Sequence, residues 1–360
     1  MINPLPQPLP IHLSLAMTSY LGATTMIELM SSSAESKISK SKLNKAKLEV
    51  EKAARNKLLD FFAGINSYAT QPVSEWKPNA KVIWQEGSTR ILDFGGKGQP
   101  ILFIPPLINR ANILDLSGEK SLMKFLSKQG NALLVDWGAP TESEINFNSD
   151  SYIQRLTRFC QTQKKLIIGG YCMGGLLALK LAKCIEPSAL ILLATPWNFH
   201  APDVKRVEIP AKHMHKYLDD LETVPPEFIQ SLFMMADPWR VYNKYSSMGK
   251  SSAPQKKSMM EIEYWVNNGV PMSVLMAKEC IIDWTINNTP GKGKWLDVSD
   301  LQMPVFLGCP TNDKIVPIGC SIPLAGLLTN ATLHKFNCGH IGMLTRKLCF
   351  EPIKEWLENL

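Results

Sequence analysis

The chain has 360 residues, of which 45% are hydrophobic and 20% are charged. This balance is typical of a globular protein and excludes a disordered or collagen-like chain. Lys and Arg outnumber Asp and Glu by 39 to 32, and this modest excess predicts a solvated surface that is compatible with an anionic substrate. The sequence contains no zinc-finger or RNA-binding motif, so no nucleic acid partner is expected.

The cysteines and the first residues bear on cellular location. Eight cysteines are spread along the chain without a C-x-x-C pair, which predicts reduced thiols. Residues 1–27 carry no Lys, Arg, Asp or Glu. They lack the basic start of a signal peptide, and no apolar run reaches the ~18 residues of a spanning helix. We therefore expect a cytoplasmic protein, with an interfacial N-terminal anchor as the alternative.

Residues 1–79 are predicted to form a helical lead-in. After a proline-rich start and a Ser-rich linker, apolar residues recur at irregular but helical spacing, which predicts an amphipathic helix that Gly64 ends. The apolar positions of this helix are Leu43, Leu48, Val50, Ala54, Leu58, Leu59 and Phe62.

From residue 80 onward the pattern alternates between strands and helices. Strands are predicted within residues 80–96 (two strands), 98–108, 131–137, 164–171 and 189–197, and helices within 121–130, 151–163 and 173–184. Such alternation predicts an α/β fold with a mostly parallel central sheet and helices on both faces.

Between residues 200 and 295 the strand signals vanish and helical segments dominate. We interpret this segment as a helical cap inserted over the carboxyl edge of the sheet. The alternation resumes in residues 296–360, with strands at 303–310 and 331–337 and helices at 318–328 and 350–360. The predicted organisation is therefore a lead-in (1–79), a first core segment (80–199), the cap (200–295) and a second core segment (296–360).

The segment Gly170-Tyr171-Cys172-Met173-Gly174 follows a buried strand and opens a helix. It matches the nucleophile elbow of α/β-hydrolases, with cysteine in place of serine. The nucleophile sits there on a strained backbone, so Gly170 and Gly174 leave room for the turn. The free N–H groups of the helix that begins at Met173 favour the thiolate of Cys172. The alternative is a buried structural cysteine, which the flanking glycines disfavour.

An elbow nucleophile needs a base and an acid that orients the base, and on this fold the acid precedes the histidine in the chain. Asp313 and His340 each follow a predicted strand by a short loop. That placement brings both to the carboxyl edge of the sheet, where Cys172 also lies. We predict a catalytic set of Cys172, Asp313 and His340, against the alternative that this histidine is structural.

The oxyanion is expected to be held by two backbone N–H groups, that of Met173 and that of Leu107 in the loop after the strand segment "PILFIPP". Tyr171, Trp197 and His200 are candidates for the pocket or the cap, and the alternative is that they only pack. No cofactor and no metal site is predicted.

With these residues in place, the sequence resembles the polyhydroxyalkanoate synthase family. The matching segments, in family order, are "PPLINRANILDL", "SLMKFLSKQG" with the following "DW", "GGYCMGG", "NDKIVP" and "GHIGM". The resemblance implies an α/β-hydrolase fold that carries out acyl transfer in place of hydrolysis.

In such synthases the cysteine takes a 3-hydroxyacyl group from coenzyme A as a thioester, and the 3-hydroxyl of one unit attacks the thioester of another. The resemblance thus implies that Cys172 carries the acyl group and that His340 activates the thiol. Asp313 is implied to be the partner of His340 or to help deprotonate the hydroxyl. The implied substrate is a 3-hydroxyacyl-CoA such as 3-hydroxybutyryl-CoA, and the product is a polyester.

The short lead-in and the C-terminal segment look more like the two-subunit kind of synthase. This resemblance implies a second synthase subunit, a homodimer and a place at the polyester granule surface. Where many synthases carry an aspartate, this chain has Asn198. Two alternatives stay open: a cysteine thioesterase, esterase or polyester depolymerase, and a granule-associated protein without activity.

Overall fold

The computed structural model describes residues 3–34, 39–71, 73, 75–202, 205–237 and 239–360. The chain divides into two compact units. The helical unit consists of Met1–Glu75 and Asp237–Asn268, and the sheet unit consists of Trp76–Ala236 and Gly269–Leu360. Each unit is described by itself below.

The sheet unit contains, among the described residues, an eight-stranded sheet of order β1-β2-β4-β3-β5-β6-β9-β10. Its strands are β1 (Lys81–Glu86), β2 (Thr89–Asp93), β3 (Pro100–Ile104), β4 (Asn131–Asp136), β5 (Ile167–Tyr171), β6 (Ala189–Leu193), β9 (Val305–Pro310) and β10 (Ala331–Phe336). β2 pairs antiparallel with β1 and β4, and the remaining pairs are parallel. The prediction of a mostly parallel α/β sheet is confirmed.

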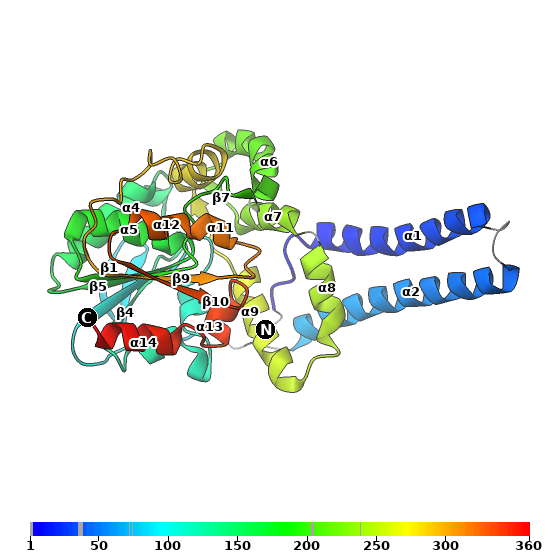
Figure 1. Ribbon diagram of the computed structural model, residues 1–360, viewed down its shortest axis with the longest axis horizontal. Coiled ribbons are helices and arrows are strands. Elements are labelled where there is room, and N and C mark those ends of the chain that lie inside the picture. Colours follow the sequence, from blue (N-terminus) through cyan, green and yellow to red (C-terminus); the bar gives the residue numbers. More distant parts are fainter. Residues whose placement is uncertain (1–2, 35–38, 72, 74, 203–204, 238) are drawn as a thin grey trace. The chain divides into compact units, whose positions relative to one another are not determined.

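Helices cover both faces of this sheet (Figure 1). They are α3 (Leu122–Leu126), α4 (Ser149–Cys160), α5 (Met173–Ile185), α11 (Ile318–Ser321), α12 (Pro323–Leu327), α13 (Gly342–Thr345) and α14 (Phe350–Glu358). In Figure 1, α4 and α5 lie on one side of the sheet and α14 lies on the other. Every residue of β5 and β6 is buried, which explains why these strands read as continuous apolar runs. The helix predicted at 318–328 is two short helices, because Pro323 begins a new one.

A hairpin near the first strands is held by a buried ion pair. Arg155 on α4 contacts the carboxylate of Glu144, which is fully buried. Burial alone raises the pKa of Glu144, but hydrogen bonds from Thr141, Ser88 and Arg155 outweigh it and lower that pKa to about 2. The Glu144 carboxylate therefore stays charged and bonds the backbone N–H of Ser88, in the β1–β2 turn, at 2.9 Å.

The residues of the sheet unit between 205 and 286 fall in the segment predicted as a cap and are called the cap below. The cap contains α6 (Lys205–Met214), the 3₁₀ helix η5 (His215–Asp220), α7 (Pro226–Ala236), α10 (Val274–Lys278) and the π-helix η6 (Glu279–Ile286). Two short strands, β7 (Thr223–Val224) and β8 (Met272–Ser273), pair antiparallel inside it. The expectation that no strand occurs in this segment was therefore wrong, because two-residue strands leave no alternating pattern to detect.

The predicted single insertion at 200–295 is also corrected. Residues 237–268 form α8 (Trp239–Met248) and α9 (Ala253–Asn267), which belong to the helical unit together with α1 (Leu9–Ala34) and α2 (Lys40–Thr70). The physical reason is an aromatic core that α2 and α8 share, in which Phe61 and Tyr242 have ring centroids 5.2 Å apart. The buried members of this core are Ala16, Phe61, Tyr68, Val241, Tyr242, Tyr245, Met248 and Met260.

Two expectations for the lead-in also fail. The predicted helix does not end at Gly64 but continues to Thr70. A side chain at position 64 would lie 2.1 Å from the carbonyl oxygen of Tyr245, so this glycine serves close packing between α2 and α8 and is not a stop signal. Of the expected linker, Ser31 to Ser33 lie within α1, where the hydroxyl of Ser32 donates to the carbonyl of Glu28 at 3.1 Å, and residues 35–38 lie outside the described residues.

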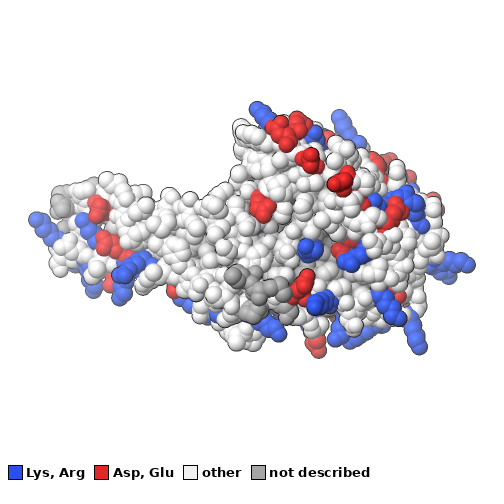
Figure 2. Space-filling view, turned by 180° about the vertical axis from the view of Figure 1, so that it is seen from behind, with Lys and Arg blue, Asp and Glu red and all other residues white. Residues whose placement is uncertain are grey.

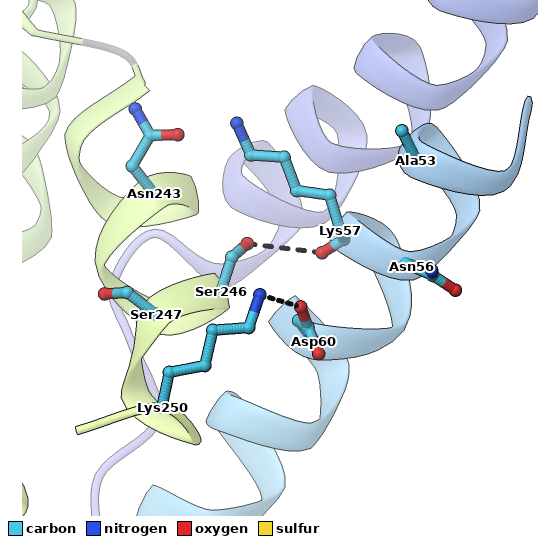
Figure 3. Close-up of a pocket in the computed structure, with 8 residues that line it drawn as sticks. All are labelled: Ala53, Asn56, Lys57, Asp60, Asn243, Ser246, Ser247 and Lys250. Atoms are coloured by element: carbon cyan, nitrogen blue, oxygen red, sulfur yellow. Dashed lines mark hydrogen bonds and ion pairs between the residues drawn. The ribbon is translucent and has the colours of Figure 1, made fainter. Parts of the chain in front are cut away.

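A polar groove runs between α2 and α8 (Figure 3). Lys250 pairs with Asp60 at 2.9 Å, and the Ser246 hydroxyl donates to the carbonyl of Lys57 at 3.2 Å. Lys244 on the same helix pairs with the buried Glu263, whose carboxylate also accepts from the Tyr245 hydroxyl at 2.9 Å. Lys244 and Lys250 therefore have a structural use.

Figure 2 shows Lys and Arg side chains interspersed with Asp and Glu over the face that it presents. This distribution agrees with the predicted solvated surface. Among the helices that the structure describes, none is long and apolar enough to cross a membrane.

Candidate active site

Cys172 lies on the sharp turn between β5 and α5. Its backbone has φ 55° and ψ −128°, which is strained for any residue other than glycine. A side chain at position 170 would lie 2.4 Å from the carbonyl oxygen of Gly174, and one at 174 would lie 2.1 Å from that of Ile104. The two glycines thus allow the elbow to fold tightly against the end of β3.

The structure brings Asp313 and His340 to the same edge of the sheet. Asp313 follows β9 and is buried, and its Oδ1 accepts hydrogen bonds from the backbone N–H of Ile315 at 2.8 Å and of Val316 at 2.9 Å. His340 follows β10, and its Nδ1 lies 2.6 Å from Oδ2 of Asp313. A carboxylate only accepts, so Nδ1 carries the proton and Nε2 is left for the thiol.

The charge of the imidazole is set by its two neighbours. Burial lowers the pKa of His340, but the charges of Asp313 and Cys172, with hydrogen bonds to both, outweigh burial and raise that pKa to about 10. The imidazolium is thus stabilised once the thiol has given up its proton. Such a set can form an ion pair between Cys172 and His340.

The two predicted oxyanion donors lie at the start of α5 and in the loop after β3. Met173 is the first residue of α5 and lines the cavity at Cys172. Leu107 is buried in the loop after β3, and its neighbour Ile108 lines the same cavity. The indole of Trp137 donates to the carbonyl of Pro105 at 3.0 Å and so fixes the start of this loop. The assignment of the two N–H groups to an oxyanion stays a prediction.

Cys172 opens into an apolar cavity of about 110 Å³ between the sheet edge and the cap. From the sheet edge and its loops come Ile108, Leu176, Pro196, Phe199, Ile315 and Val316. From the cap come Ile229, Leu232, Met272, Cys280, Ile281 and Trp284. A wall of this composition suits a small aliphatic acyl group.

The other sequence candidates lie near the cavity but outside its described wall. Tyr171 is buried beneath the elbow, and its hydroxyl donates to the carbonyl of His340 at 3.3 Å. Trp197 is buried behind the wall. The ring of His200 bonds the carbonyl of Ile286 at 3.1 Å, and the amide oxygen of Asn198 accepts from Asn288 at 2.9 Å. The loop after β6 is thereby tied to the cap.

Sequence reasoning missed most residues of the wall, among them Cys280, Trp284 and Cys320. Burial raises the pKa of Cys320 to about 12 and that of Cys280 well above its usual range. Both therefore stay protonated. No motif marks these positions, so only the folded structure reveals them.

The strand order, the strained elbow and the Cys172, His340 and Asp313 arrangement define this chain as a protein of the α/β-hydrolase fold. A solved α/β-hydrolase-fold protein from Chitinophaga pinensis agrees: it superposes with a TM-score of 0.52 at 14% identity, over 78% of this chain and 98% of that one. No protein-family model matches the chain.

Sequence relatives identify the group more closely. The chain is 26% identical over 300 residues to the poly(3-hydroxyalkanoate) polymerase subunit PhaC of Haloferax mediterranei, over 75% of this chain and 61% of that one. It is also 26% identical to the subunit of that name in Allochromatium vinosum, over 72% of this chain and 81% of the relative. The chain is a sequence relative of the poly(3-hydroxyalkanoate) polymerases, and this part of the prediction is confirmed.

Proposed function

We propose that this chain is an acyltransferase that polymerises 3-hydroxyacyl-CoA, such as 3-hydroxybutyryl-CoA, into polyhydroxyalkanoate with release of coenzyme A. The observation that carries the proposal is a cysteine on the strained elbow of a chain whose relatives are polymerase subunits. The chain spans 61% of the length of the Haloferax relative, so its activity is proposed here from the site and the relatives together.

The proposed first step is acyl transfer to Cys172. His340 takes the thiol proton at Nε2, the sulfur attacks the thioester carbonyl, and the C–S bond to coenzyme A breaks. The N–H groups of Met173 and Leu107 hold the oxyanion, and His340 returns the proton to the departing thiolate. Asp313, held by two backbone N–H groups, keeps Nδ1 protonated and Nε2 free.

The proposed second step lengthens the polymer. The 3-hydroxyl of one acyl unit loses its proton to His340, with help from Asp313, and its oxygen attacks the thioester of another unit. The new C–O bond replaces a C–S bond, and the thiol of Cys172 is regenerated. A thiol suits this sequence of steps because its loading from coenzyme A exchanges one thioester for another and is nearly isoenergetic, whereas a serine ester would hold the acyl group at lower free energy.

The proposal also covers the cellular location and the binding partners of the chain. A second synthase subunit, a homodimer and a cytoplasmic site at the polyester granule surface are inferred from the family. A tagged copy of this chain can be purified from cells that also express the candidate second subunit. Recovery of that subunit with the tagged chain would support the second subunit. Recovery of this chain alone and as a monomer would contradict both assembly claims.

The fate of the acyl group tests the proposed activity. Purified protein is given 3-hydroxybutyryl-CoA, and coenzyme A, free 3-hydroxybutyrate and insoluble polyester are measured for wild type, Cys172→Ala and Cys172→Ser. We expect coenzyme A and polymer from wild type and neither from the variants. Free acid without polymer, retained in part by Cys172→Ser, would instead make the chain a thioesterase.

A further inference from the structure

Trp284 lies on the π-helix η6 and lines the cavity at Cys172. Its side chain is 2% exposed, and its ring packs against Trp295 with centroids 5.2 Å apart. Among the described residues, its indole Nε1 has no hydrogen-bond partner. A buried N–H without a partner is costly, so a donor kept beside a cavity points to an acceptor that enters the cavity.

Other indoles of the sheet unit show the usual arrangement. Trp295 donates to Glu279 at 2.7 Å, Trp137 to the carbonyl of Pro105 at 3.0 Å and Trp76 to Asp115 at 2.9 Å. Trp197 is also unpaired and buried, but it lies outside the described cavity wall. Trp284 therefore combines an unpaired donor with a place in the wall.

The rest of the described wall offers little to bind a polar group. The hydroxyl of Thr285 is already donated to the carbonyl of Cys280 at 2.8 Å, and thiols are weak donors. The other side chains of the wall are apolar. Among the side chains of the described wall, the indole of Trp284 is thus the one strong donor without a partner.

Resting on the proposed acyl transfer, we propose that Trp284 Nε1–H donates a hydrogen bond to the 3-hydroxyl oxygen of the acyl group and so selects hydroxyacyl over unsubstituted acyl thioesters. The carbonyl oxygen of either thioester is expected to accept from the backbone N–H groups of Met173 and Leu107. A hydroxyl that accepts from Trp284 keeps its own proton for transfer to His340. Sites built to bond a hydroxyl discriminate strongly against analogues that lack it.

The test compares acylation of Cys172 by 3-hydroxybutyryl-CoA and by butyryl-CoA, read as the first burst of coenzyme A. Trp284→Phe keeps an aromatic ring without the N–H, and Trp197→Phe removes an unpaired indole N–H outside the wall. We expect Trp284→Phe to lower the preference for the hydroxylated substrate by roughly tenfold to hundredfold in kcat/KM. Trp197→Phe should leave the preference unchanged.

A binding readout separates this inference from the activity itself. In Cys172→Ala with ¹⁵N-labelled tryptophan, 3-hydroxybutyryl-CoA should shift the indole N–H signal of Trp284, and butyryl-CoA should shift it less. Equal shifts, or equal losses for both substrates in Trp284→Phe, would overturn the inference and leave the acyltransferase proposal standing. A wild type that binds and reacts with neither thioester would contradict both.

Discussion

The two walls of the cavity differ in how the sequence determines them. The sheet-edge wall carries Cys172 on the turn after β5, and Asp313 and His340 follow β9 and β10 at the same edge of the sheet. The glycines of the elbow allow the tight packing of that turn. The cap wall carries Cys280 and Trp284 on a π-helix whose residues meet the thiol only after long-range folding. Local sequence patterns therefore mark the residues proposed for the reaction, whereas no local pattern predicts the shape and polarity of the substrate pocket.

The largest expected effect separates the two walls directly. Cys172→Ala should lower acyl uptake from 3-hydroxybutyryl-CoA at least a thousandfold, because it removes the proposed acyl carrier. Cys280→Ala, which deletes a thiol held protonated on the cap wall, should change the rate severalfold at most. Coenzyme A release over time measures both rates. Similar losses in the two variants would contradict the claim that Cys172 carries the acyl group and Cys280 only lines the cavity.

The elbow makes a second prediction, on stability. Gly174→Ala places a Cβ 2.1 Å from the carbonyl oxygen of Ile104, so the free energy of unfolding should fall by about 3 kcal/mol or more. Gly326 in α12 has open space around it, and Gly326→Ala should instead stabilise by about 0.5 to 1 kcal/mol. Urea unfolding measures both, and equal effects would show that the elbow is not tightly packed.

The histidine predicts a pH dependence of stability. Because the folded-state pKa of His340 is raised from 6.5 to about 10, its protonation stabilises the folded state. That contribution is fully present below pH 6.5 and is lost as the pH rises through about 10. Unfolding of wild type and His340→Gln across this range should therefore show a gap that closes at high pH, and a gap that widens would contradict the assignment of charge.

The smallest effect concerns the tie between the β6 loop and the cap. Asn288 adopts φ 51°, donates to Asn198 and accepts from the backbone N–H of Phe199 at 2.8 Å. Asn288→Gly keeps this backbone conformation and removes both hydrogen bonds, so it should cost about 1 to 2 kcal/mol of stability. Thermal unfolding checks this value, and an unchanged Tm would mean that the tie adds nothing.

Much of the fold was predictable because strand and helix periods are local signals. The buried strands β3, β5 and β6 and the elbow at Cys172 fall where the sequence placed them. The division of residues 200–295 between two units was not predictable, since it depends on the contact of Phe61 with Tyr242, far apart in the chain. The prediction at Gly64 was wrong for the same reason, because the sequence alone does not distinguish a glycine that permits close packing from one that ends a helix.

Covalent capture of the acyl group tests the central claim most directly. Wild-type protein is mixed with 3-hydroxybutyryl-CoA, quenched in acid within seconds, digested and examined by mass spectrometry. We expect a 3-hydroxybutyryl thioester, or its short oligomers, on the peptide that contains Cys172. Acyl groups on another residue, or turnover without any adduct on Cys172, would contradict the account.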